Sequence, residues 1–175
     1  MTRVLVVYES MFGNTREIAN AVAEGLADAG AVDVVEVSKA PTTLSEDVDL
    51  LVVGAPTHAF GLSRPSTRKS AADQAVGEIV STGIGVREWL DELRPLGKPA
   101  VVSAFDTRIK IALMPGSAAR RALGTLRRLG FPMLLRSESF YVTGTPGPLK
   151  DGEVDRAKRW GAKLAGTHSA RQHAN

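Results

Sequence analysis

The apolar residues of this chain fall into short runs that alternate with segments of helical spacing. Runs rich in branched aliphatic residues predict five β-strands, at 3–8, 32–37, 49–54, 99–105 and within 131–142. Apolar residues three or four positions apart predict helices at 15–29, 86–93, 117–129 and from 151 onward. Because the strands alternate with helices, we expect a parallel sheet with helices on both faces, which is an α/β fold.

Two segments stand outside this regular alternation. The segment 41–47 holds little apolar material and is expected to form one helical turn at most. The mostly polar connection 55–82 is longer than a compact domain normally carries without structure. We therefore expect this connection to be functional or to contain a short helix.

The turn between the first strand and the first helix, residues 8–15, is rich in hydroxyl, amide and glycine groups. A strand that enters a helix through such a turn directs unpaired backbone N–H groups to one point, where the helix dipole adds partial positive charge. This arrangement is typical of a phosphate site. The alternative is a capping box, since Glu17 follows Asn14 by three residues. Capping alone does not explain the hydroxyls of Ser10 and Thr15, so we favour the phosphate site.

Three loops are expected at the carboxyl ends of the strands, at 9–14, 55–66 and 105–116. In open parallel sheets, ligands bind beyond that edge, at the point where the strand order reverses. We therefore expect these three loops to form one binding site.

Composition narrows the classes of protein to consider. Apolar residues make up 43% and charged residues 23% of the chain, as in ordinary soluble globular domains. No apolar run approaches the ~18 residues that a membrane span needs, and no signal region precedes the first strand, so we expect a cytoplasmic protein without a membrane span. There are no cysteines, which excludes disulfides, thiol catalysis and cysteine-ligated metals. We expect one domain over 1–167 and a flexible polar tail over 168–175.

Charge is unevenly distributed along the chain. Of its 22 Lys and Arg and 19 Asp and Glu, the first 60 residues hold 3 and 9, and the remainder holds 19 and 10. The basic excess is concentrated in Arg108, Lys110, Arg120, Arg121, Arg127, Arg128 and Arg136. Such a patch attracts acidic partners or nucleic acid, but these residues are not interleaved with aromatic residues as in a base-stacking platform. We therefore interpret them as a solvated helix face and do not expect a nucleic-acid partner.

Other functions of α/β folds lack their motifs here. A phosphorylation receiver needs an aspartate at the end of the third strand, where Gly54-Ala55-Pro56 stands. A P-loop NTPase needs a lysine before Thr15, and a dinucleotide site needs three glycines after the first strand. Histidines and carboxylates are not clustered as a metal hydrolase requires, so no metal site is expected.

One run resembles the flavodoxin signature, with a permitted residue at every fixed position: Val6-Val7-Tyr8-x-Ser10-x-x-Gly13-x-Thr15-x-x-x-Ala19-x-x-Val22. Gly54-Ala55-Pro56-Thr57 resembles the second loop of that family, and the stretch 147–153 is similar to actinobacterial members. The order of strands and helices agrees with the family over nearly the whole chain.

This resemblance implies a flavodoxin-like, doubly wound, five-stranded sheet of order 2-1-3-4-5 in three αβα layers, with FMN as cofactor. It implies that Ser10 and Thr15 offer hydroxyls to the FMN phosphate. Backbone N–H groups would come from Met11, Phe12, Gly13, Asn14 and Thr15. One wall beside the flavin ring would consist of Pro56, Thr57, His58, Ala59, Phe60 and Gly61. The other wall would consist of Ser103, Phe105, Asp106, Thr107 and Arg108.

The two walls depart from the usual pattern of the family. Flavodoxins commonly stack a Trp and a Tyr on the two ring faces, whereas these walls offer His58, Phe60 and Phe105. The third loop also lacks the usual glycines and aromatic residues. Flavodoxins are usually acidic, whereas this chain has a formal net charge of +3 at pH 7, so their usual basic electron-transfer partners do not carry over.

Two classes of function follow. The first is a redox flavoprotein, either an electron carrier or a small reductase of the quinone or protoporphyrinogen type, acting on a redox partner protein or a quinone-like small molecule. FMN would supply the redox chemistry, so no catalytic side chain is required, although His58 is placed to hydrogen-bond near flavin N5. The second is a flavodoxin-like module without flavin that acts as a binding or regulatory domain through its basic C-terminal half.

Overall fold

The computed structural model describes residues 1–113 and 115–174 and is built around one parallel sheet. The five strands of this sheet are β1 (Thr2–Tyr8), β2 (Gly30–Glu36), β4 (Leu50–Pro56), β6 (Val101–Ile109) and β7 (Glu138–Val142). Their order is β2-β1-β4-β6-β7. Two shorter strands, β3 (Thr43–Leu44) and β5 (Arg94–Pro95), pair in a separate sheet. Counted along the main sheet, the order is therefore the predicted 2-1-3-4-5, and the predicted fold class is confirmed.

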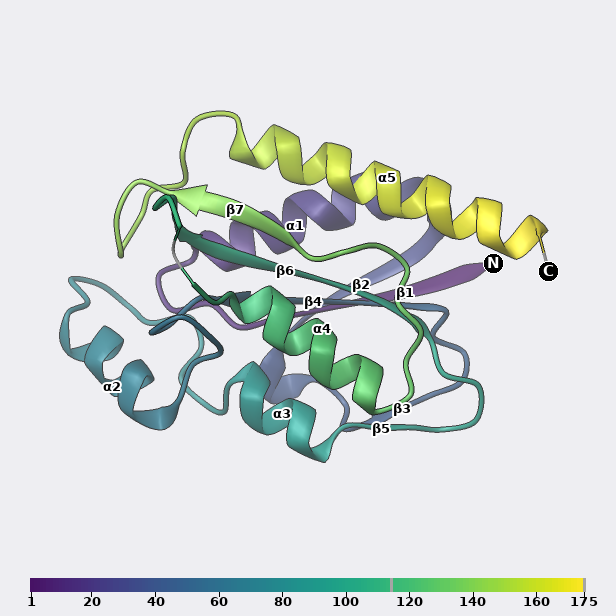
Figure 1. Ribbon diagram of the computed structural model, residues 1–175, viewed down its shortest axis with the longest axis horizontal. Helices are drawn as coiled ribbons and strands as arrows, with labels where there is room; N and C mark the ends of the chain where they lie inside the picture. The colour runs from purple at the N-terminus through teal and green to yellow at the C-terminus, as the bar shows by residue number, and fades with distance from the viewer. Residues whose placement is uncertain (114, 175) are drawn as a thin grey trace.

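Helices cover both faces of the sheet and give the molecule three layers (Figure 1). One face carries α1 (Asn14–Leu26) and α5 (Glu153–His173), and the other carries α3 (Val86–Glu92) and α4 (Ala118–Arg128). The remaining α-helix is α2 (Pro65–Asp73), which lies beyond the carboxyl ends of the strands. This helix falls inside the long polar connection 55–82, which was expected to be functional or to contain a short helix. Two short 3-10 helices are η1 (Ala27–Ala29) and η2 (Val37–Lys39).

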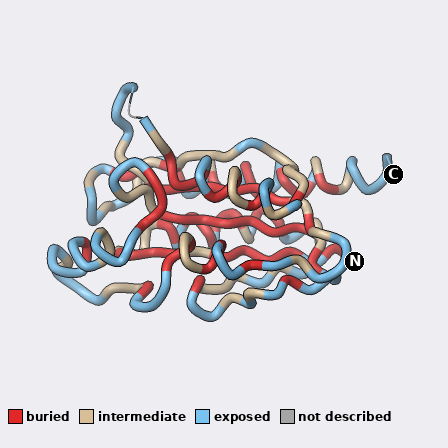
Figure 2. Tube along the Cα trace, turned by 60° about the horizontal axis from the view of Figure 1, so that its bottom comes forward, coloured by how far each residue is buried: buried red, intermediate tan, exposed pale blue. Residues whose placement is uncertain are grey.

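The central strands contribute to an apolar core on each face of the sheet. Successive residues of a strand point to opposite faces, so Val6 packs under α1 and α5 while Val7 packs under α3 and α4. Figure 2 shows these strands as continuous buried segments at the centre of the molecule. Burial on both faces explains why their sequences are unbroken apolar runs. Trp89, in the apolar stripe that predicted the helix at 86–93, is fully buried, and its indole N–H donates to the carbonyl of Pro41 at 3.0 Å.

An aromatic cluster fills the core beneath α5. The rings of Phe105, Phe140 and Trp160 contact one another edge to face, with centroids 6.0–6.1 Å apart. The ring of Phe105 lies against the backbone of β4, where a Cβ added at Gly54 would be 2.1 Å from a ring carbon. Only glycine leaves room for this close approach. Phe105 is therefore committed to the core on the α1 and α5 face.

Strand β6 extends further than the sequence predicted. Residues 106–108 were expected in a loop, but all three belong to the strand. Phe105–Ile109 pair with all of β7, and the end of β4 pairs with the same part of β6. Backbone hydrogen bonds on both sides thus keep polar residues extended where the apolar pattern has ended. Met114, in the predicted loop 105–116, lies outside the described residues.

Two predicted segments gain detail from the structure. The helix predicted over 15–29 consists of α1 followed by η1, which ends at Ala29, and Gly30 then opens β2. The segment 41–47, expected to form one helical turn at most, contains strand β3, because Thr43 and Leu44 pair with β5.

The C-terminal helix is also longer than predicted. Helix α5 runs through His173, so the tail predicted from residue 168 begins too early. His168 is 4% exposed and, with Leu164 and Ala165, continues the buried face of the helix. Tertiary packing thus orders a stretch whose composition is polar. Asn175, the last residue of the predicted tail, lies outside the described residues.

Candidate functional site

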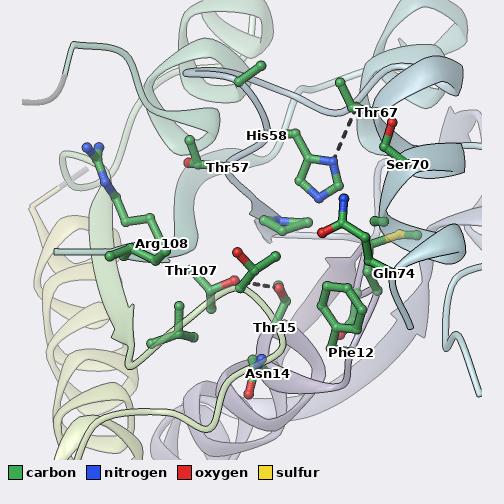
Figure 3. Close-up of a pocket in the computed structure, with 18 residues that line it drawn as sticks. Phe12, Asn14, Thr15, Thr57, His58, Thr67, Ser70, Gln74, Thr107 and Arg108 are labelled. Carbon is green, nitrogen blue, oxygen red and sulfur yellow. Dashed lines mark hydrogen bonds between the residues drawn. The ribbon is translucent and has the colours of Figure 1, made fainter. Parts of the chain in front are cut away.

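A cavity of about 320 Å³ lies at the carboxyl ends of the strands. The turn after β1 contributes Ser10, Met11, Phe12, Asn14 and Thr15 to its lining. The segment from β4 into α2 contributes Pro56, Thr57, His58, Ala59, Thr67, Ser70, Ala71 and Gln74. The end of β6 and the segment after β7 contribute Thr107, Arg108, Ile109, Val142 and Thr145. The three predicted loops therefore do meet at one site (Figure 3).

We call residues 10–15 the phosphate turn and the rest of the lining the far wall. At the phosphate turn, Gly13 adopts a left-handed conformation (φ 95°) as the N-cap of α1, and no described side chain caps the helix. The alternative capping box from Asn14 to Glu17 does not form. Because the first N–H groups of a helix have no intrahelical acceptor, they point toward the cavity end of α1. This favours the predicted anion site.

The phosphate turn is fixed from behind by a residue that the sequence did not single out. The backbone N–H of Ser10 donates to Oγ of Ser81 at 2.9 Å, and the N–H of Ser81 donates to the carbonyl of Ser10 at 2.7 Å. The hydroxyl of Ser81 donates in turn to Glu36 at 2.8 Å. Ser10 itself is buried, and its Oγ accepts from the N–H of Gly13 at 3.1 Å. No local pattern marks Ser81, since its partners are distant in sequence.

Glu9, directly before the turn, is a second anchor that the sequence analysis missed. Its side chain is fully buried, and Oε1 accepts from the N–H of Val86 at 2.7 Å, while Oε2 has no partner among the described residues. Burial raises the pKa of this carboxyl above its usual range, against the lowering effects of Ser63, Val86 and Arg68. Arg68 lies in α2 and pairs with Glu88 of α3 at 2.7 Å. This buried group therefore links the phosphate turn to both helices.

The segment after β4 divides into residues that line the cavity and residues that do not. His58 and Gly61 exchange two backbone hydrogen bonds, of 2.8 and 3.0 Å, across a tight turn. Both central residues have positive φ, 43° at Ala59 and 70° at Phe60, as in a type I′ turn. This turn directs Phe60 outward, where it is 54% exposed. Phe60 and Gly61 are therefore outside the cavity lining, contrary to the prediction.

His58 points into the cavity as a neutral imidazole (Figure 3). Burial, with the nearby charge of Arg68, lowers the pKa of its ring below the usual 6.5. Nδ1 lies 3.2 Å from Oγ1 of Thr67, whose hydroxyl already donates to the carbonyl of Arg64. Nδ1 is therefore the protonated nitrogen, and Nε2 is left as an acceptor.

Helix α2 supplies a part of the far wall that sequence reasoning missed. Thr67, Ser70, Ala71 and Gln74 of this segment line the cavity. Its N-terminal turn is held by Thr67, whose Oγ1 accepts from the N–H of Arg64 at 2.8 Å. The residues are small and polar, so the apolar spacing that identifies helices was too weak to mark this one.

The end of strand β6 presents three consecutive residues, 107–109, to the cavity. Thr107 and Arg108 line it as predicted. Oγ1 of Thr107 lies 2.7 Å from Oγ1 of Thr15, which joins the far wall to the phosphate turn. Arg108 donates from Nη1 to the carbonyl of Gly116 at 2.8 Å, so the guanidinium also holds the loop after β6.

The other predicted residues of β6 do not reach the cavity. Ser103 is buried and hydrogen-bonds with the backbone of Leu135, and Phe105 is a core residue. Asp106 is buried, and its Oδ2 accepts from Thr57 at 3.0 Å, from the hydroxyl of Ser117 and from the N–H of Ala119 at 3.1 Å. These three residues, predicted for the second wall, lie outside the cavity lining because continued strand pairing turns their side chains into the interior. Asp106 instead fastens β4 and the start of α4 to β6.

The described part of the chain offers neither a membrane span nor a metal site. None of its helices has both the length and the apolar character needed to cross a bilayer. Within residues 1–113 and 115–174, His, Asp and Glu do not gather in groups of three that would hold a metal ion.

Comparison with known proteins bears on the site as a whole. Residues 6–82, which include the phosphate turn and α2, match the family model described as Flavodoxin. A NAD(P)H dehydrogenase (quinone) of Gluconacetobacter diazotrophicus is 36% identical over 87 residues, 50% of this chain and 40% of the relative. A protein of the same description from Acidovorax ebreus is 35% identical over 100 residues, 44% of this chain and 48% of the relative. The match thus spans less than half the length of these curated relatives.

Solved structures agree with the fold over nearly the whole chain. Flavodoxin 1 of Bacillus cereus superposes with a TM-score of 0.64 at 20% identity, covering 94% of this chain and 98% of that one. A WrbA-like flavodoxin of Agrobacterium tumefaciens gives a TM-score of 0.58 at 20% identity, covering 99% of each chain. FMN is the cofactor implied by these matches, and an uncapped helix start beside two hydroxyls fits its phosphate. Residues 6–82 thus match the Flavodoxin family model, and the chain as a whole has the flavodoxin-like fold.

Proposed function

We propose that this protein is an FMN-dependent reductase that passes electrons to quinone-like small molecules. The observation that carries the proposal is that the phosphate turn and a polar far wall line one cavity of about 320 Å³, within the range of small-molecule sites. The similarity to NAD(P)H dehydrogenases (quinone) supports a quinone-type acceptor and NAD(P)H as the reductant.

The phosphate turn would hold the phosphate end of FMN. The hydroxyls of Ser10 and Thr15 and the first N–H groups of α1 are neutral donors that suit a dianion. Ser10 lies beside Gly13 and Thr15 beside Thr107, so both hydroxyls are fixed before the ligand binds. When bound, FMN supplies the electron transfer. The protein's part is to hold the phosphate end and present the ring to the far wall.

His58 would accept a hydrogen bond from a group bound beside the far wall. Its Nδ1–H donates to Thr67, and Nε2 accepts a hydrogen bond from a group inside the cavity. The lowered pKa keeps the ring neutral at pH 7, so Nε2 is available as an acceptor. A neutral acceptor suits an N–H or O–H group on either the flavin or the reduced acceptor.

A reductase is favoured over a carrier for protein partners by the character of the far wall. Flavodoxin carriers cover both flavin faces with aromatic rings, whereas the described lining includes a single benzene ring, that of Phe12. The remaining lining side chains include no other benzene or indole ring, and a flavin face left uncovered is accessible to a planar acceptor. The flavin-free module that the sequence left open is not favoured, because it gives no reason for the paired hydroxyls at an uncapped helix.

The experiment starts with purified protein reconstituted with FMN. Flavin absorbance that stays with the protein through gel filtration, and FMN release on denaturation, are expected. Oxidation of NAD(P)H is then followed with a water-soluble benzoquinone as acceptor, with free FMN at the same concentration as the control. Bound flavin without quinone reduction above this control would contradict the proposed reductase, and failure to retain FMN would contradict the cofactor site.

A further inference from the structure

The mouth of the cavity is bordered by exposed apolar residues. Phe60 is 54% exposed, Ile111 is 52% exposed and Leu113 is fully exposed. Phe60 and the loop after β6 lie together, since a Cβ added at Gly116 would be 2.0 Å from the Phe60 carbonyl oxygen. In Figure 2 the tube on either side of residue 114 stands clear of the body of the molecule. Large apolar side chains in such a position mark an interaction site.

The same border is strongly basic. Residues 107–137 contain seven Lys and Arg and no Asp or Glu. Lys110 follows the cavity residues directly and is exposed, and Arg120 and Arg121 are exposed at the start of α4. Arg121 lies beside the turn after β4, because a Cβ added at Gly61 would be 3.9 Å from its Cγ. We call this set, Phe60, Lys110, Ile111, Leu113, Arg120 and Arg121, the rim.

We propose that the rim docks on an anionic lipid surface, with Ile111 and Leu113 entering the interface and the basic residues contacting lipid headgroups. Basic residues next to exposed apolar side chains are the usual composition of a peripheral membrane contact. A projecting loop favours a lipid surface over an acidic protein, because protein interfaces are broad patches of about 800 Å² on each partner. The proposed contact is peripheral, because none of the described helices is long and apolar enough to cross a membrane.

The consequence for function rests on the proposed quinone reduction. Quinones with apolar tails dissolve in the bilayer, so a docked rim would turn the cavity mouth toward the phase that holds the acceptor. Ile109, which lines the cavity, is two residues from Ile111. The lipid contact and the cavity mouth are thus parts of one segment.

The test is co-sedimentation of the full, FMN-loaded chain with two kinds of vesicle, phosphatidylcholine alone and an equimolar mixture with phosphatidylglycerol. We expect binding to the anionic vesicles to be at least about 10-fold tighter and to weaken as salt is raised. Ile111→Gln combined with Leu113→Gln should weaken it about 10-fold, from lost apolar burial. Arg120→Gln combined with Arg121→Gln should weaken it about 30-fold.

Matched control variants remove the same chemistry elsewhere. Leu96→Gln changes an exposed apolar residue (58% exposed) away from the rim, and Arg159→Gln with Lys163→Gln removes two exposed charges from α5. Both controls should bind vesicles within about 2-fold of the unmodified protein. Retained FMN absorbance in every variant shows that each is folded.

Three outcomes would overturn the inference. These are no preference for anionic vesicles, equal losses in the controls, or a loss with the charge variants while the apolar pair has no effect, which would show that Ile111 and Leu113 do not enter the lipid interface. Reduction of a water-soluble quinone is measured on the same samples without vesicles. Unchanged turnover without vesicle binding contradicts the docking alone, whereas vesicle binding without any turnover contradicts the proposed function alone.

Discussion

The phosphate turn and the far wall of the cavity contrast in how the chain builds them. The phosphate turn is one contiguous segment between β1 and α1, and its shape follows from a glycine with positive φ and a helix start. The far wall is assembled from segments far apart in the sequence, which run from β4 into α2, along the end of β6, and from the end of β7 to Thr145. Its residues are held by side-chain bonds across long sequence distances, such as Thr57 to Asp106 at 3.0 Å.

Because of this contrast, we expect substitutions in the phosphate turn and in the far wall to act in different ways. A contiguous turn recognises a phosphate through backbone N–H groups, so its function depends on local geometry. The far wall depends on strand pairing and on buried anchors such as Asp106, so substitutions in it act through the fold as well as the ligand. Four substitutions distinguish effects on ligand binding from effects on the stability of the fold, from the largest expected effect to the smallest.

Phe105→Ala should destabilise the protein by about 3–5 kcal/mol, because it opens a cavity in the aromatic cluster with Phe140 and Trp160. FMN affinity of the folded protein should change little, since Phe105 faces the core. Urea unfolding and FMN titration measure the two quantities. Phe60→Ala is the matched control and should change the unfolding free energy by less than about 0.5 kcal/mol. Unchanged stability with a large loss of FMN affinity would make Phe105 a ring contact instead.

Thr15→Val should lower FMN affinity by about 10- to 100-fold, through loss of a hydrogen bond to a charged group worth about 1.5–3 kcal/mol. Fluorescence titration with FMN measures this. Riboflavin, which lacks the phosphate, should bind the variant and the unmodified protein equally. Thr125→Val, a change of the same chemistry in α4, is the control. An equal loss for riboflavin would show that Thr15 does not read the phosphate.

Glu9→Gln should change how stability depends on pH. The raised pKa means that the folded state holds a proton that the unfolded chain releases above about pH 4.5. This contribution is therefore fully present below that pH and is lost as pH rises through the folded pKa, with a slope of at most about 1.4 kcal/mol per pH unit. Glutamine does not ionise, so the variant should gain stability relative to the unmodified protein as pH rises. Denaturant unfolding from pH 4 to pH 8 measures it, and parallel curves would refute the buried, protonated carboxyl.

His58→Ala should have the smallest effect, lowering quinone turnover by about 3- to 10-fold through loss of one neutral hydrogen bond. FMN affinity should stay within about 3-fold. Because the ring's pKa is lowered by burial, the unmodified protein should also lose stability as pH falls below about 6.5, and the variant should lose less. His173→Ala, at the exposed end of α5, is the control. Unchanged turnover would remove His58 from the proposed chemistry.

Much of the molecule could be predicted from the sequence because the residues that define each strand, helix and turn are close together in the chain. Buried strands read as apolar runs, and helices α1, α3 and α4 read as apolar stripes. The phosphate turn was predicted from adjacent residues, since a strand, a glycine turn and a helix start fix where the backbone N–H groups point. Trp89 belongs to the apolar stripe that predicted α3, and it is buried.

The far wall was decided by tertiary structure. Pairing with β4 and β7 keeps β6 extended through Ile109 and turns Phe105 and Asp106 into the cores. A tight turn with two positive φ angles directs Phe60 away from the cavity. Helix α2, whose sequence has little apolar spacing, lines the cavity and is joined to α3 by the ion pair of Arg68 and Glu88.

The sequence by itself thus determined the fold class and the phosphate end of the site, because both depend on residues close together in the chain. Tertiary structure decided which side chains form the far wall, because alternate residues of one strand face opposite ways and only pairing with neighbours sets how far that alternation continues. It also decided the role of Glu9, whose buried carboxyl is meaningful only with α2 and α3 packed around it.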